Sequence, residues 1–82
     1  MKTDQEIKII IRSIIARKRA HRKALLELKA AEDALNGLRV QFNDGKASVS
    51  DMAKVTEAFE AAKVKVSLKA QAVTKAEASL KD

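Results

Sequence analysis

Large apolar side chains recur along the first half of the chain at alternating spacings of three and four residues. This seven-residue repeat is typical of an α-helix that buries one stripe against a partner helix. Two positions break the stripe, because Arg17 and His21 stand where the repeat calls for apolar residues. The pattern predicts one helix over about residues 4–43. Its buried stripe, called the seam below, consists of Ile7, Ile10, Ile14, Arg17, His21, Ala24, Leu28, Ala31, Leu35, Leu38 and Phe42.

Local signals mark where this first helix begins and ends. Thr3 followed by Glu6 is a capping box, in which the two residues satisfy unpaired groups at the start of a helix. Gly45 can take the left-handed conformation that closes a helix without a steric penalty. We therefore expect a loop over residues 44–48.

The same spacing of apolar residues resumes after the loop. Either Ser48 or Ser50 is placed to cap a second helix, and Asp51 suits its positive N-terminus. The pattern predicts this helix over about residues 49–81, with one cation, Lys69, inside its stripe. The second seam consists of Met52, Val55, Phe59, Ala62, Val66, Lys69, Val73, Ala76 and Leu80.

Two long helices joined by a short loop are expected to fold back antiparallel. We therefore predict an all-α, coiled-coil-like hairpin that occupies residues 1–82 as a single domain. Pairing the seams from the loop outward makes the loop-proximal half apolar and leaves the distal half weak. There, Arg17 is expected within reach of Glu77. Lys69 is likewise expected within reach of Glu27.

The first helix is predicted to be longer than the second, so its isoleucine-rich first turns should overhang the end of the hairpin. A second, weaker apolar stripe lies outside the seams. We expect a second copy of the chain to cover both features, which gives a homodimer built as a four-helix bundle. The stripe consists of Ile11, Ile15, Leu25 and Leu26 on the first helix and Val64, Leu68 and Ala72 on the second. The predicted protein-interface residues are Ile7, Ile9, Ile10, Ile11, Ile14 and Ile15.

In such a dimer the polar residues of the seam have a role of their own. Arg17, His21 and Lys69 would disfavour slipped pairings of the helices, at some loss of stability. The alternative is that Arg17 and His21 belong to a binding site. Replacing both with leucine separates the two interpretations, because only the first predicts a gain in stability.

Composition argues against catalysis. The 82 residues contain no cysteine, proline, tryptophan or tyrosine and only one histidine. Thiolate chemistry is therefore excluded, and no serine, aspartate or second histidine lies within a turn of His21. One hairpin also cannot build a concave pocket. We predict a protein that is not an enzyme, with no catalytic or metal-ligating residues, no cofactor and no small-molecule substrate.

The formal net charge of +6 is unevenly distributed. Residues 1–40 carry ten Lys/Arg against five Asp/Glu, whereas residues 41–82 carry seven against six. At 100° per residue, four of these cations align in a narrow arc about 22 Å long, called the basic ridge below: Lys8, Arg12, Arg19 and Lys23. With their neighbours they give the predicted site for an anionic partner, which consists of Lys8, Arg12, Arg17, Lys18, Arg19, Arg22 and Lys23.

Cations on a rigid helix are suited to a phosphate backbone. Aromatic side chains are absent among these basic residues, so bases cannot stack on the surface and a duplex is favoured over a single strand. The sequence therefore predicts a small binding module whose basic first helix engages double-stranded RNA or DNA, or a nucleic-acid-binding protein.

Three alternatives stay open. The chain can instead be a small interaction or inhibitor protein, such as an accessory factor of a phage or mobile element. It would then dock on an acidic protein surface through its isoleucine-rich end, without contacting nucleic acid. The charges can also be no more than a solvated face. A membrane-surface helix is disfavoured, because the isoleucines continue the seam without a phase shift.

No targeting segment or membrane-spanning stretch is recognised, so a cytoplasmic location is expected. We recognise no motif of a known protein family.

Overall fold

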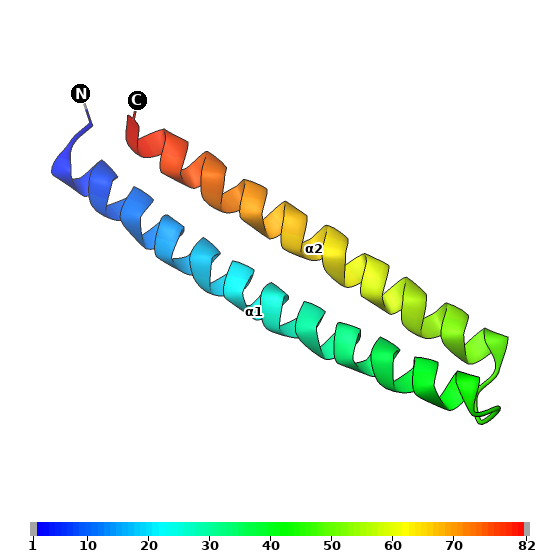
Figure 1. Cartoon of the computed structure of the whole chain (residues 1–82). Coiled ribbons are helices and arrows are strands. Elements are labelled where there is room, and N and C mark those ends of the chain that lie inside the picture. Colours follow the sequence, from blue (N-terminus) through cyan, green and yellow to red (C-terminus); the bar gives the residue numbers. More distant parts are fainter. Residues whose placement is uncertain (1, 82) are drawn as a thin grey trace.

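The chain folds into two long antiparallel α-helices joined by one short loop (Figure 1). The computed structural model describes residues 2–81. Helix α1 spans Asp4–Asn43 and helix α2 spans Val49–Lys81. They lie side by side in a rod whose Cα trace measures 63 × 14 × 13 Å, with the loop at one end and both termini at the other. The predicted all-α hairpin is confirmed.

Side chains close the start of each helix. The Thr3 hydroxyl oxygen accepts a hydrogen bond from the Glu6 amide at 3.2 Å, and the hydroxyl donates to the Glu6 carboxylate at 3.1 Å. At the start of α2, Ser48 Oγ accepts from the Asp51 amide and the Ser48 amide donates to Asp51 Oδ2, both at 3.1 Å. Ser48 is therefore the cap of α2. Hydrogen bonding of the Asp51 carboxylate to the Ser48 backbone amide, and then to its side chain, lowers the pKa of Asp51.

The loop closes α1 with a Schellman motif. The Lys46 amide donates to the Gln41 carbonyl at 2.7 Å, and the Gly45 amide donates to the Phe42 carbonyl at 3.0 Å. Gly45 has φ of 76°, the left-handed conformation that this motif requires and that only glycine adopts cheaply. The turn directs the chain back along α1, so that the two seams face each other.

The seams lie where the repeat places them. Four seam residues are nearly fully buried, and they are Ile14, Ala24, Leu35 and Ala76. Most of the others are half-buried, His21 and Lys69 among them. The seam positions that stay exposed are Ile7, Arg17, Phe42 and Leu80, three of which lie toward the ends of the helices.

The expectation that the distal half packs weakly needs correction. Three of the four buried residues, Ile14, Ala24 and Ala76, lie in that half, and only Leu35 lies near the loop. Alanines in the seam let the backbones approach, so a small side chain is covered by the opposite helix where a larger one would stay partly exposed. The distal seam is therefore well covered at these three positions even though it contains cations.

Candidate nucleic-acid interface

The fold gathers positive charge at the end of the rod opposite the loop. We call this region the open end; it consists of residues 4–26 of α1 and residues 67–81 of α2. The two segments meet across the seam, where Arg17 bonds to Ala72. Ten lysines and arginines stand in the open end against three carboxylates, Asp4, Glu6 and Glu77. The ten are Lys8, Arg12, Arg17, Lys18, Arg19, Arg22, Lys23, Lys69, Lys75 and Lys81.

The rest of the rod is close to neutral. Residues 27–66, which we call the loop half, carry six lysines and arginines and seven aspartates and glutamates. Counted along the chain, the charge surplus falls almost wholly on α1. The antiparallel fold adds three lysines of α2 to the same end. Sequence reasoning placed Lys69 in the second seam but included none of the three in the predicted site, although the pairing of the seams already puts them at this end.

The basic ridge lies on the side of α1 that faces away from α2. Lys8, Arg12, Arg19 and Lys23 are all exposed. They form two pairs four residues apart, and the helix rise spreads them over about 22 Å. Within residues 2–81 none of the four takes part in a salt bridge. Their charge is therefore directed to solvent.

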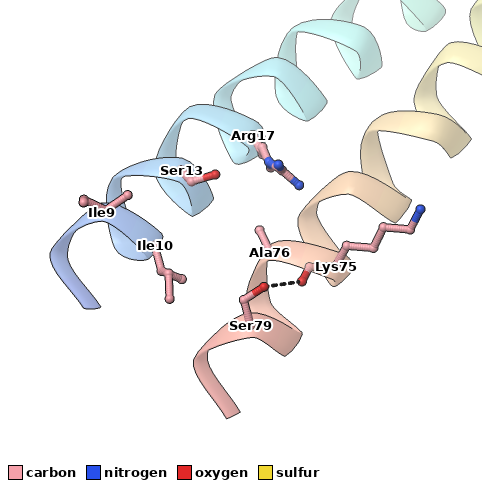
Figure 2. A pocket seen from close by; sticks show the side chains of 7 residues that line it. All are labelled: Ile9, Ile10, Ser13, Arg17, Lys75, Ala76 and Ser79. Atoms are coloured by element: carbon pink, nitrogen blue, oxygen red, sulfur yellow. Dashed lines mark hydrogen bonds between the residues drawn. The ribbon is translucent and has the colours of Figure 1, made fainter. Parts of the chain in front are cut away.

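Arg17 does not join this ridge. Its guanidinium crosses the gap between the helices and donates a hydrogen bond to the Ala72 carbonyl at 2.9 Å. Figure 2 shows the side chain extending from α1 toward α2 beside Ala76. A carbonyl oxygen has two lone pairs, so it can serve this bond and the helical one together. The expected contact with Glu77 is wrong, because a closer backbone acceptor satisfies the guanidinium.

Lys18 and Arg22 lie beside apolar side chains. Lys18 lines a hollow with Ile11, Ile14 and Ile15 of α1 and the last turns of α2. Arg22 lines a second hollow further along α1, together with Leu25, Leu26 and Lys29. The seven predicted site residues therefore occupy three different places: the ridge, the groove between the helices, and one flank of α1.

The carboxylate four residues after Lys23 is already engaged. Glu27 accepts a hydrogen bond from Lys65 of α2 at 2.8 Å, and this contact also joins the helices. The bond and the charge of Lys65 lower the pKa of Glu27, with smaller contributions from Lys23 and Lys69. Sequence pairing assigned Glu27 to Lys69, so the partner is wrong by one turn of α2.

The isoleucines surround the tip of the open end. Ile9 and Ile10 line a hollow together with Lys75, Ala76 and Ser79 of α2, and Figure 2 shows Ile10 directed toward that helix. Ile11 and Ile15 line the hollow on the opposite flank, and Ile14 is buried between them. Only part of the predicted interface is therefore free, because α2 covers Ile14 and half-covers Ile10.

Comparison with protein-family models finds no match, and comparisons with curated proteins and with solved structures also find none. Residues 2–81 contain no cluster of three or more histidines, cysteines, aspartates or glutamates arranged to hold a metal ion. Neither described helix is long and apolar enough to cross a bilayer. The distribution of charge is thus the main chemical feature of the surface.

Proposed function

We propose that the protein is a non-enzymatic binding module whose open end engages the phosphate backbone of a nucleic-acid duplex. The observation that supports this is the charge of the open end, which holds ten lysines and arginines against three carboxylates. Such a density of like charge raises the local potential and attracts a polyanion. Seven of the ten cations stand on α1, where no carboxylate occurs between Glu6 and Glu27.

The choice of a duplex follows from what lies beside the cations. The only aromatic residues, Phe42 and Phe59, are in the loop half, so the open end offers no platform for stacking bases. A straight ridge of four exposed cations contacts phosphates without reading base edges. Binding should therefore depend on salt and hardly on sequence. A cytoplasmic location, where such partners occur, is part of the proposal.

Fluorescence anisotropy with two unrelated labelled duplexes of about 24 base pairs tests this proposal. With the four ridge contacts, affinity should fall roughly 100-fold between 50 and 200 mM salt, equally for both duplexes. Changing Lys8, Arg12 and Lys23 to glutamine should make the slope of log K against log salt shallower by about 2.7. Circular dichroism of the variant should show unchanged helix content.

A matched control removes the same charge from the other half of the rod. Changing Arg39, Lys46 and Lys54 to glutamine also lowers the net charge by three, but these residues lie in the loop half. This variant should retain the wild-type salt slope. Equal losses in the two variants would show that only net charge matters, and no measurable binding at 50 mM salt would reject the proposal.

A second candidate rests on the exposed isoleucines. Ile9 is 56% exposed and Ile11 43%, although both lie at the end where the cations gather. Apolar side chains rimmed by cations also suit an acidic protein surface, as in an interaction or inhibitor protein. Ile9→Asp would abolish binding to such a protein while leaving the salt slope for a duplex unchanged.

A further inference from the structure

The groove between the helices opens into a hollow at the tip of the open end (Figure 2). Its volume is about 440 Å³, within the range of about 300–1,000 Å³ that is typical of small-molecule sites. The side chains of Ala76 and Ser79, which line it from α2, are small and leave the groove unfilled. The hairpin therefore has a concave surface that the seam pattern alone does not predict.

Arg17 brings a positive charge to this hollow. Its guanidinium is held by the Ala72 carbonyl through Nη1 at 2.9 Å. A guanidinium has five N–H donors in a fixed fork, so a bond through Nη1 leaves the edge formed by Nε and Nη2 open. Such an edge binds two oxygens of a carboxylate or phosphate side by side. The backbone bond therefore holds Arg17 in place and leaves its anion-binding edge unused.

Ser13 adds a second unused donor, one turn before Arg17. Its side chain is half-buried, yet within residues 2–81 its hydroxyl makes no hydrogen bond. Hydroxyls inside a helix often bond the carbonyl four residues back, as those of Thr56, Thr74 and Ser79 do here. Figure 2 shows the Ser13 hydroxyl on the same side of α1 as Arg17. A half-buried donor without a partner favours a ligand that accepts from it.

The charge available in the hollow matches a ligand with a single negative charge. Lys75 borders the hollow, but Figure 2 shows its amine pointing away from α1. The described residues that line the hollow include no aspartate or glutamate, so the charge of Arg17 is not neutralised there. A phosphate monoester carries about two negative charges at neutral pH, whereas a carboxylate carries one. A carboxylate is therefore the better match for Arg17 and Ser13.

Apolar side chains form the rest of the wall. Ile9 is 56% exposed and Ile10 is half-buried, and both stand beside the buried Ala76. An alkyl chain attached to the carboxylate would remove these isoleucines from water, and each buried methylene strengthens binding. The ligand chemistry that fits the whole hollow is therefore an acid with one carboxylate and an alkyl chain.

We propose that this hollow binds an alkyl carboxylate, with the carboxylate on Arg17 and Ser13 and the alkyl chain on Ile9 and Ile10. The site does not depend on duplex binding by the basic ridge. At 100° per residue, Ser13 and Arg17 point at least about 80° away from every ridge residue around α1. Variants of the hollow should therefore keep the salt-dependent affinity for a duplex, and the two proposals fail separately.

NMR titration of the isotope-labelled protein tests the site, with octanoate below its micelle concentration as the probe. Octanoate should shift the amide signals of Ser13, Ala76 and Ser79 to saturation. Acetate, octanol and octylammonium should not saturate these shifts at the same concentration, because each lacks the alkyl chain or the negative charge. Octyl phosphate should bind no more tightly than octanoate. No saturable shift with octanoate, an equal response to octanol, or tighter binding of octyl phosphate would overturn the proposal.

Two variants show which groups hold the carboxylate. Ser13→Ala should weaken octanoate binding about tenfold, because it removes one hydrogen bond to a charged acceptor. Ser67→Ala is the matched control, since Ser67 is exposed on α2 outside this hollow, and it should leave the affinity unchanged. Arg17→Gln should abolish saturable binding, but it also removes the bond to Ala72. The decision therefore rests on Ser13→Ala, whose hydroxyl has no partner to lose, and an unchanged affinity in that variant would reject the site.

Discussion

The open end and the loop half are built from the same seven-residue repeat, yet they differ in charge and in which residues they bury. The loop half holds larger apolar side chains in its seam and is nearly neutral, but only Leu35 is well buried there. The open end is strongly positive and has cations in its seam, yet it buries Ile14, Ala24 and Ala76. Nearly complete burial in this hairpin therefore does not follow the size of the apolar residues, since two of the four buried residues are alanines.

The fold tolerates cations in the open end because Arg17 is hydrogen-bonded and the ridge residues stay solvated. The Arg17 guanidinium ends on a backbone carbonyl, which satisfies one of its donors. The ridge residues lie in solvent and lose no hydration on folding. The difference between the halves thus shows that charge can be concentrated on a thin rod provided that the cations stand on the outer face or reach the backbone.

The largest effect should come from removing the one large buried side chain of the loop half. Leu35 is 4% exposed, so Leu35→Ala should lower the free energy of unfolding by about 2–4 kcal/mol, from lost burial and the cavity left behind. Urea unfolding followed by circular dichroism measures this. Val40→Ala is the control, since Val40 is 61% exposed, and equal losses would show that the loop half has no core.

Overfilling the open end should have a somewhat smaller effect. Ala24 is 1% exposed at a point where α2 covers it, so Ala24→Leu should force the helices apart and destabilise the protein by about 1–3 kcal/mol. The same unfolding experiment applies. Ala34→Leu, at an exposed site, should change little. If Ala24→Leu stabilised the hairpin, the close approach inferred for the open end would be contradicted.

Ionic strength should affect the two halves differently. Like charges in the open end repel, and salt shortens the Debye length from about 30 Å at 0.01 M to about 8 Å at 0.15 M. Raising salt over this range should therefore stabilise the wild type by roughly 0.5–1 kcal/mol, as a shift of the urea midpoint. The Lys8, Arg12 and Lys23 glutamine variant should lose most of this gain. The Arg39, Lys46 and Lys54 variant should keep it, and a reversed ranking would place the repulsion in the wrong half.

The smallest expected effect is the loss of stability at acid pH through Glu27, which lies at the border between the open end and the loop half. Because Lys65 lowers the pKa of Glu27, the ionised form is favoured in the folded state. Its contribution to stability is complete above the ordinary value of 4.5 and is lost as pH falls through the lower folded pKa. Carbon-detected NMR titration should give a pKa for the Glu27 carboxyl that lies below 4.5.

Two lysine variants show whether Lys65 is the cause. Lys65→Gln should move the Glu27 midpoint upward, because the bonding partner is gone. Lys63→Gln removes a lysine that pairs with Glu60, so it should leave the titration midpoint of Glu27 unchanged. A Glu27 titration indifferent to Lys65 would mean that the contact between the helices is not formed in solution.

The features that could be predicted from sequence are those with local causes. The seams, the Thr3 cap and the turn at Gly45 each depend on residues within a few positions of one another, so their chemistry is readable in the sequence, although the Glu6 carboxylate bonds to the Thr3 hydroxyl and not to its amide. The acceptor of Arg17 and the partner of Glu27 depend instead on how the helices rotate about their axes. A choice between Lys65 and Lys69 is a choice between adjacent turns, and residue spacing alone does not make it.

The candidate site was predicted in part for the same reason. The ridge follows from 100° per residue on one helix, and its members are exposed as expected. The separation of Arg17 from the ridge and the addition of Lys69, Lys75 and Lys81 are consequences of the second helix. A charge count along α1 does not include the lysines of α2 that the antiparallel fold places beside it.

The bond from Arg17 to the Ala72 carbonyl has a consequence for how the sequence can diverge. Its acceptor belongs to the backbone, so substitutions at position 72 that keep the helix and leave space for the guanidinium also keep the bond. A salt bridge in the same place would need two residues to change together. Position 17 is therefore constrained while its partner position can drift, and the contact could persist through mutations that would erase an ion pair.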